Sequence, residues 1–254
     1  MKYLFTFLLS CLAGYLLAQV QHGTITYLRT TEVSLTMDND DPGADKVMQE
    51  MMAQMSASGA FNKTFNAHFS PTEFSCEEEY KKPTEIKSEL SGGRVVVMMT
   101  GDSDPAHYHT NTQTGEVTNK DFILDKSFLV SGKKPVVEWK LTGEKIAPSE
   151  QTAGLDLLVA TGISAEGDTL IAGYAPSLPV QVGPLNYYGL PGAIITLRIP
   201  RNGQETVYRA TTLSVSPEPL EIKKPTEGKP ISYDKFLKER EKRQPKVTRV
   251  DRSN

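Results

Sequence analysis

The feature that most limits the fold of this chain is a long series of short β-prone runs separated by turn residues. Breaks such as Gly92-Gly93, Gly101-Asp102 and Thr114-Gly115 divide several of them. Many short strands at regular spacing are typical of an antiparallel sandwich or a barrel-like sheet. The expected strands cover residues 62–69, 72–80, 93–100, 105–110, 115–123, 126–131, 135–141, 153–163 and 168–174.

Alternation of apolar and polar residues adds three further strands. Residues 23–37 alternate near the start of the chain, as a strand with one buried face requires. Residues 193–199 alternate again, and Asn202-Gly203 predicts a type I′ turn before the returning run 207–213. A second tight hairpin is expected at residues 166–168, where Gly167 stands between two acidic residues.

Two short helices complete the expected fold. Residues 46–58 follow helical spacing, with Asp45 as the N-cap and an apolar face made by Met48, Met51, Met52 and Met55. Near the C-terminus, Ser232 can cap a helix whose one face carries Tyr233, Phe236 and Leu237. The predicted fold is therefore mainly β, with one Met-rich helix and one C-terminal helix.

The two ends of the chain differ from its middle. Residues 1–18 combine Lys2 with an uninterrupted apolar run, which is typical of a secretory signal peptide cleaved near Ala18. The alternatives are an uncleaved anchor and lipidation at Cys11, and the run is short for either. Residues 19–216 are expected to form one β-rich domain without a transmembrane span. Residues 217–254 contain several prolines and an excess of basic residues, which predicts a mobile basic tail.

Composition excludes two broad classes. The 254 residues are 38% apolar and carry a formal net charge of −3, so a disordered chain is not expected. The same balance lacks the basic surface that nucleic-acid binding needs. Once the signal segment is removed, Cys76 is the single cysteine left, and the prediction is a buried thiol without a disulfide partner.

Candidate metal ligands form two weak groups. The four helix methionines could present sulfur to copper(I), although core packing explains the same spacing. His107 and His109 would share one face of a strand near Asp102 and Asp104, without a third ligand set by spacing. No metal or other cofactor is therefore expected. The nucleophile elbow, zinc-protease, P-loop and dinucleotide motifs are all absent from the sequence, while a triad assembled from distant residues stays open.

The most distinctive segment runs from Val182 to Ile194 and contains Gly189-Leu190-Pro191-Gly192. Together with Gly23-x-Ile25-x-Tyr27, Glu138-Trp139-Lys140-Leu141-Thr142 and Ala172-x-Tyr174-x-Pro176, it resembles the GLPGLI proteins of the Bacteroidetes. The resemblance is close over residues 138–199. It implies an exported envelope protein, often encoded near outer-membrane receptors, with no established activity, cofactor or catalytic residue.

The resulting functional prediction is a non-enzymatic binding or accessory module of the cell envelope. Its partner would be an outer-membrane receptor or another envelope protein, and its location periplasmic, outer-membrane-associated or extracellular. Copper handling and an uncharacterised hydrolase are the alternatives. Residues 190–193 are expected to form a type II turn with Gly192 at positive φ. The tentative binding residues are those of the motif loop, with Tyr187 and Tyr188 either exposed for docking or packed on the domain: Tyr187, Tyr188, Gly189, Leu190, Pro191 and Gly192.

Overall fold

A computed structural model describes most of the chain after the predicted signal segment. The described residues are 22–32, 42–57, 59–90, 94–100, 104–201 and 204–243. The predicted signal peptide, Cys11, the end of the first predicted strand, the Asn202-Gly203 turn and residues 244–254 lie outside them.

Twelve strands of the described chain form one large sheet, so the fold is mainly β as predicted. Their order across the sheet is β14-β8-β7-β6-β3-β2-β1-β13-β12-β11-β10-β9. All neighbours are antiparallel except β14 and β8, which are parallel. The strands are β1 (His22–Glu32), β2 (Lys63–Phe69), β3 (Glu73–Glu78), β6 (His107–Asn111), β7 (Glu116–Ile123), β8 (Lys126–Lys133), β9 (Lys140–Ile146), β10 (Leu157–Ile163), β11 (Thr169–Ala175), β12 (Ala193–Arg201), β13 (Gln204–Ser216) and β14 (Lys229–Ser232).

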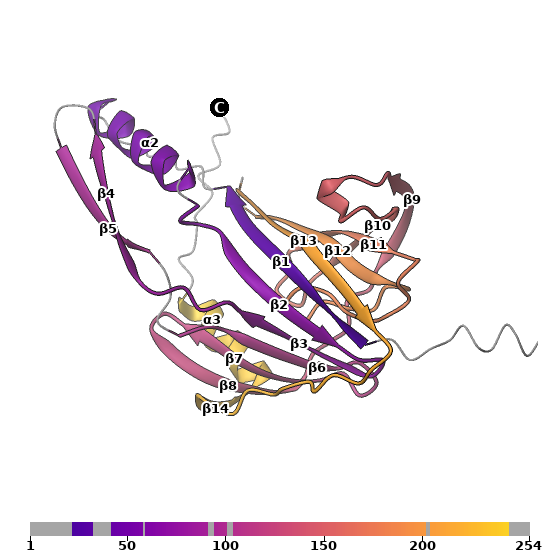
Figure 1. Ribbon diagram of the computed structural model, residues 1–254. Coiled ribbons are helices and arrows are strands. Elements are labelled where there is room, and N and C mark those ends of the chain that lie inside the picture. Colours follow the sequence, from indigo (N-terminus) through magenta and orange to yellow (C-terminus); the bar gives the residue numbers. More distant parts are fainter. Residues whose placement is uncertain are drawn as a thin grey trace, which may run out of the picture.

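The sheet is strongly bent but open. Its two end strands, β14 and β9, do not pair with each other, so the barrel-like alternative is wrong. Figure 1 shows β9 to β12 on one side of the bend and β6 to β8 on the other. Register shifts interrupt the pairing of β1 with β13, of β10 with β9 and of β11 with β12. Such bulges increase local twist, which explains how one sheet can fold back toward itself.

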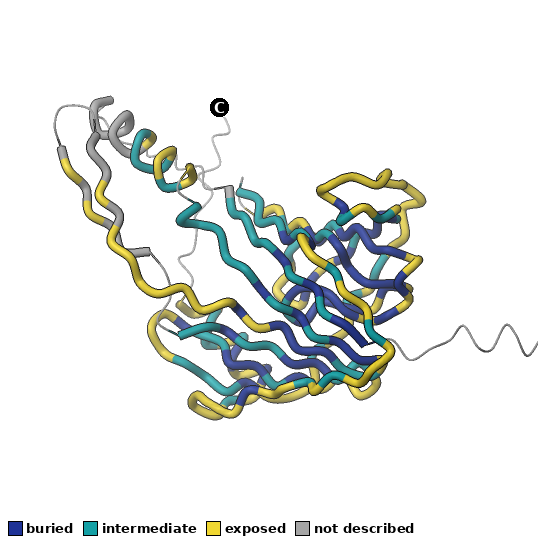
Figure 2. The backbone as a smooth tube through the Cα atoms, in the orientation of Figure 1, coloured by how far each residue is buried: buried dark blue, intermediate teal, exposed yellow. Residues whose placement is uncertain are grey.

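The core lies at the middle of this sheet. Ile25 and Tyr27 of β1 are fully buried, which confirms the predicted inward face of the first strand. They pack in one cluster with Phe69 of β2, Ala210 of β13 and Ile195 of β12. Figure 2 shows buried residues along parts of these strands, and burial continues into β3, β10 and β11. Burial of this many apolar side chains is the main force that holds a fold without disulfides together.

The Met-rich helix and a separate hairpin extend away from the main sheet (Figure 1). Helix α2 (Pro42–Ala57) begins earlier than predicted, so Asp45 lies within its first turn and is not the cap. Proline is well tolerated there because the first helical N–H groups have no intrahelical partner. The helix contacts β4 (Thr84–Leu90), which pairs with β5 (Arg94–Thr100) in a two-stranded sheet. Strand β4 is absent from the sequence prediction, because its alternating charged residues give little apolar signal.

The predicted mobile tail is wrong for residues 229–243. Strand β14 adds to the main sheet beside β8, and α3 (Tyr233–Arg243) follows it directly. Tyr233 and Phe236 are buried against Val117 of β7 and Val130 of β8, as the predicted apolar helix face requires. This segment therefore belongs to the folded domain, whose boundary lies beyond residue 216.

The region between β8 and β10 also differs from the prediction. The expected strand 135–141 is displaced, because β9 covers Lys140–Ile146 and residues 134–139 pair with no strand. A short 3-10 turn (η1, Glu150–Thr152) precedes β10, so the expected start at residue 153 is too early. The displaced segment packs its side chains on the sheet: a Cβ on Gly162 would lie 2.5 Å from Val137. Within the described part of the chain, no helix has the length and apolar character needed to cross a membrane.

Candidate functional site

The GLPGLI-like segment is built on close backbone contacts. A Cβ on Gly192 would lie 2.2 Å from the carbonyl oxygen of Ala175, and one on Gly183 would lie 2.3 Å from that of Tyr187. The predicted type II turn is wrong, since Gly192 is not in the left-handed region and Gly189, with φ of 102°, is. Gly192 is therefore required for space between two backbone segments and not for its φ angle.

Hydrogen bonds join this segment to distant parts of the chain. The hydroxyl of Tyr27 donates to the carbonyl oxygen of Ile194 at 2.7 Å inside the core. The indole N–H of Trp139 donates to the carbonyl oxygen of Tyr188 at 2.9 Å. Three sequence pieces that resemble the GLPGLI proteins thus meet at one place, where they hold the segment against β1 and β12.

The two motif tyrosines are not exposed. Tyr187 and Tyr188 have exposed fractions of 7% and 5%, so neither offers the surface that the docking alternative requires. Tyr188 packs edge-on against Phe74, with ring centroids 6.2 Å apart. Of the other tentative binding residues, Leu190 and Gly192 are buried, while Gly189 and Pro191 are exposed. The alternative in which both tyrosines pack on the domain is the one that agrees with their burial.

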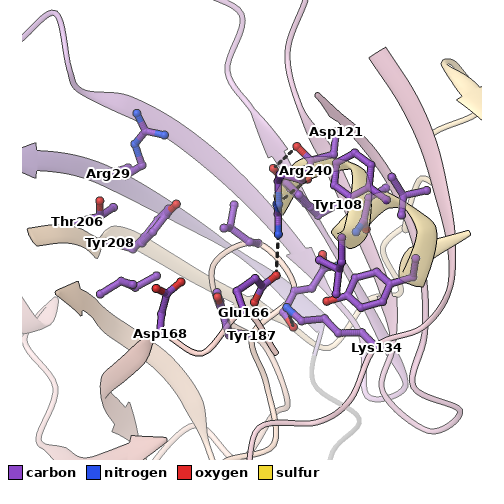
Figure 3. A pocket seen from close by; sticks show the side chains of 18 of the residues that line it. Arg29, Tyr108, Asp121, Lys134, Glu166, Asp168, Tyr187, Thr206, Tyr208 and Arg240 are labelled. Atoms are coloured by element: carbon purple, nitrogen blue, oxygen red, sulfur yellow. Dashed lines mark hydrogen bonds and ion pairs between the residues drawn. The ribbon is translucent and has the colours of Figure 1, made fainter. Parts of the chain in front are cut away.

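Tyr187 instead faces a cavity of about 410 Å³. The cavity is lined by β1, β12 and β13 on one side and by β6, β7, β8 and α3 on the other, with the β10–β11 turn between them. Because these elements come from both halves of the bent sheet, the cavity lies inside the bend. Figure 3 shows side chains from both halves around it. Its volume is in the range of small-molecule sites.

Three carboxylates in the lining are already engaged. Asp168 forms a two-pronged ion pair with Arg201, whose Nε lies 2.7 Å from Oδ1. Arg240 of α3 lies 2.7 Å from Glu166 of the β10–β11 turn and 3.7 Å from Asp121 of β7. Loss of hydration raises the pKa of Asp121, against the opposing effect of Arg240. Arg240 thus connects α3 to β7 and to the β10–β11 turn (Figure 3).

Lys134, directly after β8, is a basic group of the lining without such an ion pair in the described chain. Its Nζ lies 4.2 Å from the centroid of the Tyr187 ring and 3.5 Å from the carbonyl oxygen of Asn186. Among the described residues, no carboxylate lies within ion-pair distance of it. Loss of hydration lowers the pKa of Lys134 to about 8. Asn186 is held in place by donating to the Thr110 hydroxyl at 2.7 Å, which orients the loop beside the lysine.

Two further donors in the lining are buried without a hydrogen-bond partner in the described chain. They are Nε of Arg29 and the hydroxyl of Tyr233. Burial raises the pKa of Tyr233, so its hydroxyl keeps its proton. Burial also raises the pKa of Tyr208 to about 12, an effect that the nearby Arg29 opposes. Arg29 and Tyr208 face each other across β1 and β13.

The predicted histidine ligands, His107 and His109, are not part of the cavity lining. His109 is buried and its Nε2 lies 3.0 Å from Oε2 of Glu73, while Asp104 pairs with Lys120. Burial lowers the pKa of His109, although Glu73 opposes the shift. Within the described ranges, no three His, Cys, Asp or Glu side chains gather as a metal site, and Asp102 lies outside those ranges.

The sulfur-containing candidates are not part of the cavity lining either. Met51, Met52 and Met55 are partly buried on α2, and the side chain of Met48 lies outside the described residues. Cys76 is buried and unbridged in the core, where burial raises its pKa to about 12. A thiol with that pKa stays protonated and is a poor nucleophile at neutral pH.

Sequence reasoning missed most of the cavity. Arg29, Lys134 and Arg240 come from elements that are far apart in the chain, so no local spacing marks them. Tyr187 is among the predicted binding residues, but as part of a docking surface or of the packed domain and not as the wall of a cavity. The helix pattern did indicate that Tyr233 and Leu237 point inward, and both line the cavity.

Comparisons with known proteins give little further guidance. No protein-family model matches the sequence, and no curated protein is similar to it. Four solved chains match in structure. One of them is PNGF-II, which is 14% identical, with a TM-score of 0.46 over 86% of this chain and 32% of that chain. The present chain thus spans about a third of the length of PNGF-II.

Proposed function

We propose that this protein is a non-enzymatic binding module of the cell envelope, and that its ligand site is the cavity inside the bent sheet. The observation that carries the proposal is a cavity of about 410 Å³ lined by both halves of the sheet and by α3. Mixed aromatic, aliphatic and charged walls of this size suit a small molecule.

The chemistry of the lining favours binding over hydrolysis. Among the described residues that line the cavity there is no serine, cysteine or histidine. Asp121, Glu166 and Asp168 each lie within ion-pair distance of an arginine, so none of these three carboxylates is free to act as a general base without giving up that contact. Nothing in the lining favours copper handling, since the methionines of α2 are not part of it.

Export and envelope location belong to the same proposal. Residues 1–18 support a cleaved signal peptide, and the order of motifs from Gly23 to Ile199 supports membership of the GLPGLI proteins. The open edge of β9 supports a protein partner, because an unpaired strand can accept another strand. The proposed partner is an outer-membrane receptor or another envelope protein.

A test of the ligand site is native mass spectrometry of protein purified from its own envelope. We expect the native chain to retain a small molecule, and Thr206→Trp, which places an indole in the cavity, to lose it. Thr212→Trp is the matched control, because Thr212 lies on the same strand but is exposed and outside the lining. Equal ligand content in all three proteins would contradict the cavity as the site.

A separate test addresses location and partner. Amino-terminal sequencing of the envelope fraction should start near Gln19, and crosslinking in intact cells should capture an envelope protein. An intact Met1, or crosslinks to cytoplasmic proteins alone, would contradict export.

A further inference from the structure

The cavity has more hydrogen-bond donors than acceptors to satisfy them. Nε of Arg29 and the hydroxyl of Tyr233 are buried and have no partner in the described chain. Among the described residues, the ammonium of Lys134 has only a carbonyl oxygen at 3.5 Å and the face of Tyr187 as partners. A buried donor without an acceptor costs free energy, so each of these groups favours a ligand that brings an acceptor.

The three carboxylates of the same cavity, by contrast, already have hydrogen-bond or ion-pair partners. Asp168 is held by Arg201, and Glu166 by Arg240. Asp121 receives the hydroxyl of Tyr108 at 3.4 Å and also faces Arg240. Four basic side chains line the cavity against three acidic ones, which leaves the charge of Lys134 or Arg29 in excess.

The two lining cations that form no ion pair with a described residue, Lys134 and Arg29, lie at different ends of the cavity. Figure 3 shows Lys134 near Tyr187 and Arg29 beside Thr206 and Tyr208, with Glu166 and Asp168 between them. One small anionic group can therefore meet only one of the two. Lys134 is the stronger anchor, because its ammonium contacts only the Tyr187 ring and one carbonyl oxygen among the described residues, whereas the Arg29 side chain also hydrogen-bonds to Tyr208.

We propose that the cavity binds a small carboxylate-bearing molecule, with its carboxylate on Lys134 and its body extending toward Arg29. The inference rests on the proposed binding function and specifies the chemical class of the ligand. Tyr187, Phe236 and Leu237 supply an apolar wall for the body of the ligand. Arg29 supplies a donor for a second acceptor, such as a carbonyl or hydroxyl oxygen.

The probes are aryl carboxylic acids, each paired with its primary amide, beginning with phenylacetate and phenylacetamide. Members of a pair have nearly the same shape and differ in charge. Binding to the mature chain is measured by ligand-observed NMR and calorimetry. We expect the acids to bind at least about ten-fold more tightly than their amides.

Two variants locate the binding. Lys134→Met keeps the length of the side chain and removes the charge, so it should weaken binding of the acids about ten-fold or more and leave the amides unchanged. Lys133→Met is the matched control, because Lys133 is the exposed neighbour at the end of β8. Circular dichroism and melting temperature establish that both variants are folded.

Each remaining outcome has a distinct meaning. Equal binding of acids and amides would overturn the carboxylate inference and leave the binding cavity in place. Acid binding that survives Lys134→Met would overturn the role of Lys134. If no pair binds while Thr206→Trp and the native chain carry the same molecules, both the inference and the proposed function fail.

Discussion

At the scale of single residues, two glycines allow the segment of residues 183–194 to close against the sheet. At Gly183 and at Gly192, two backbone segments approach so closely that a Cβ atom on the glycine would collide with a carbonyl oxygen. The exposed Gly189 contributes differently, since its positive φ turns the chain between Tyr188 and Leu190. Substitution of these two kinds of glycine is therefore expected to lower the free energy of unfolding by different amounts.

Gly192→Ala should lower the free energy of unfolding by about 3 kcal/mol, because the added methyl forces the backbone away from Ala175. Gly167→Ala is the control. Gly167 has φ of 85° and open space around it, so only the left-handed strain, about 1 kcal/mol, applies. Urea unfolding of both variants measures the difference. A smaller loss for Gly192→Ala than for Gly167→Ala would contradict the close approach.

A second prediction for a single residue concerns Lys134 and the pH dependence of stability. Burial lowers its folded-state pKa to about 8 from 10.5, so the unfolded chain binds more protons between these pH values. Stability of the native chain should therefore rise with pH across this window, relative to Lys134→Met. The gain is on the order of 2 kcal/mol, reduced from the full shift because the side chain is only partly buried.

Urea unfolding at several pH values checks this difference. Lys133→Met should follow the native profile, since Lys133 is exposed. Parallel profiles for the native chain and Lys134→Met would mean that Lys134 is not desolvated.

At the scale of elements, the C-terminal strand and helix complete both the sheet and the cavity. Strand β14 pairs with β8 in parallel, and α3 lays Phe236 against Phe128 with ring centroids 5.9 Å apart. Arg240, one turn further along, reaches Glu166 on the β10–β11 turn. A segment that by composition resembles a solvated tail is thus anchored at three places.

Phe236→Ala should destabilise the chain by about 3 kcal/mol, because it removes a fully buried ring from the small core under α3. Lys238→Ala, an exposed change on the same helix, should have little effect. Thermal unfolding and limited proteolysis measure the two variants. If Phe236→Ala leaves the melting temperature unchanged, α3 does not form part of the stable fold.

At the scale of the whole molecule, one bent sheet carries the core and the cavity, while α2 and the β4–β5 hairpin form a separate projection. The hairpin pairs with no strand of the main sheet within the described chain. A two-stranded sheet has little buried area and is marginally stable alone. The projection is therefore expected to open more readily than the sheet that carries the cavity.

Hydrogen exchange should reveal this difference directly. Backbone amides of β4 and β5 should exchange much faster than those of β1 and β13, which are paired on both sides at the centre of the sheet. Exchange of the hairpin at the rate of the central strands would show that it unfolds only with the whole domain.

Local patterns predicted most of the strands and both helices. Alternation located the inward face of β1 and β12, and the glycine at residue 167 located a hairpin, because these features depend on neighbours along the chain. Local patterns did not predict the elements that depend on a partner far away in the sequence. Residues 135–139 have β propensity, but they pair with no strand of the described chain. Strand β14 has little β propensity, but it pairs with β8.

The sequence by itself therefore determined the β class, the burial of Cys76 and the inward face of the C-terminal helix, since burial and periodicity follow from the order of apolar residues. Tertiary structure alone decided the strand order, the open bend of the sheet and the cavity. Arg29, Lys134, Glu166 and Arg240 meet there only because bulged strands fold the two halves of the sheet toward each other. Pairing between distant strands is set by the packing of the whole chain, which no local pattern contains.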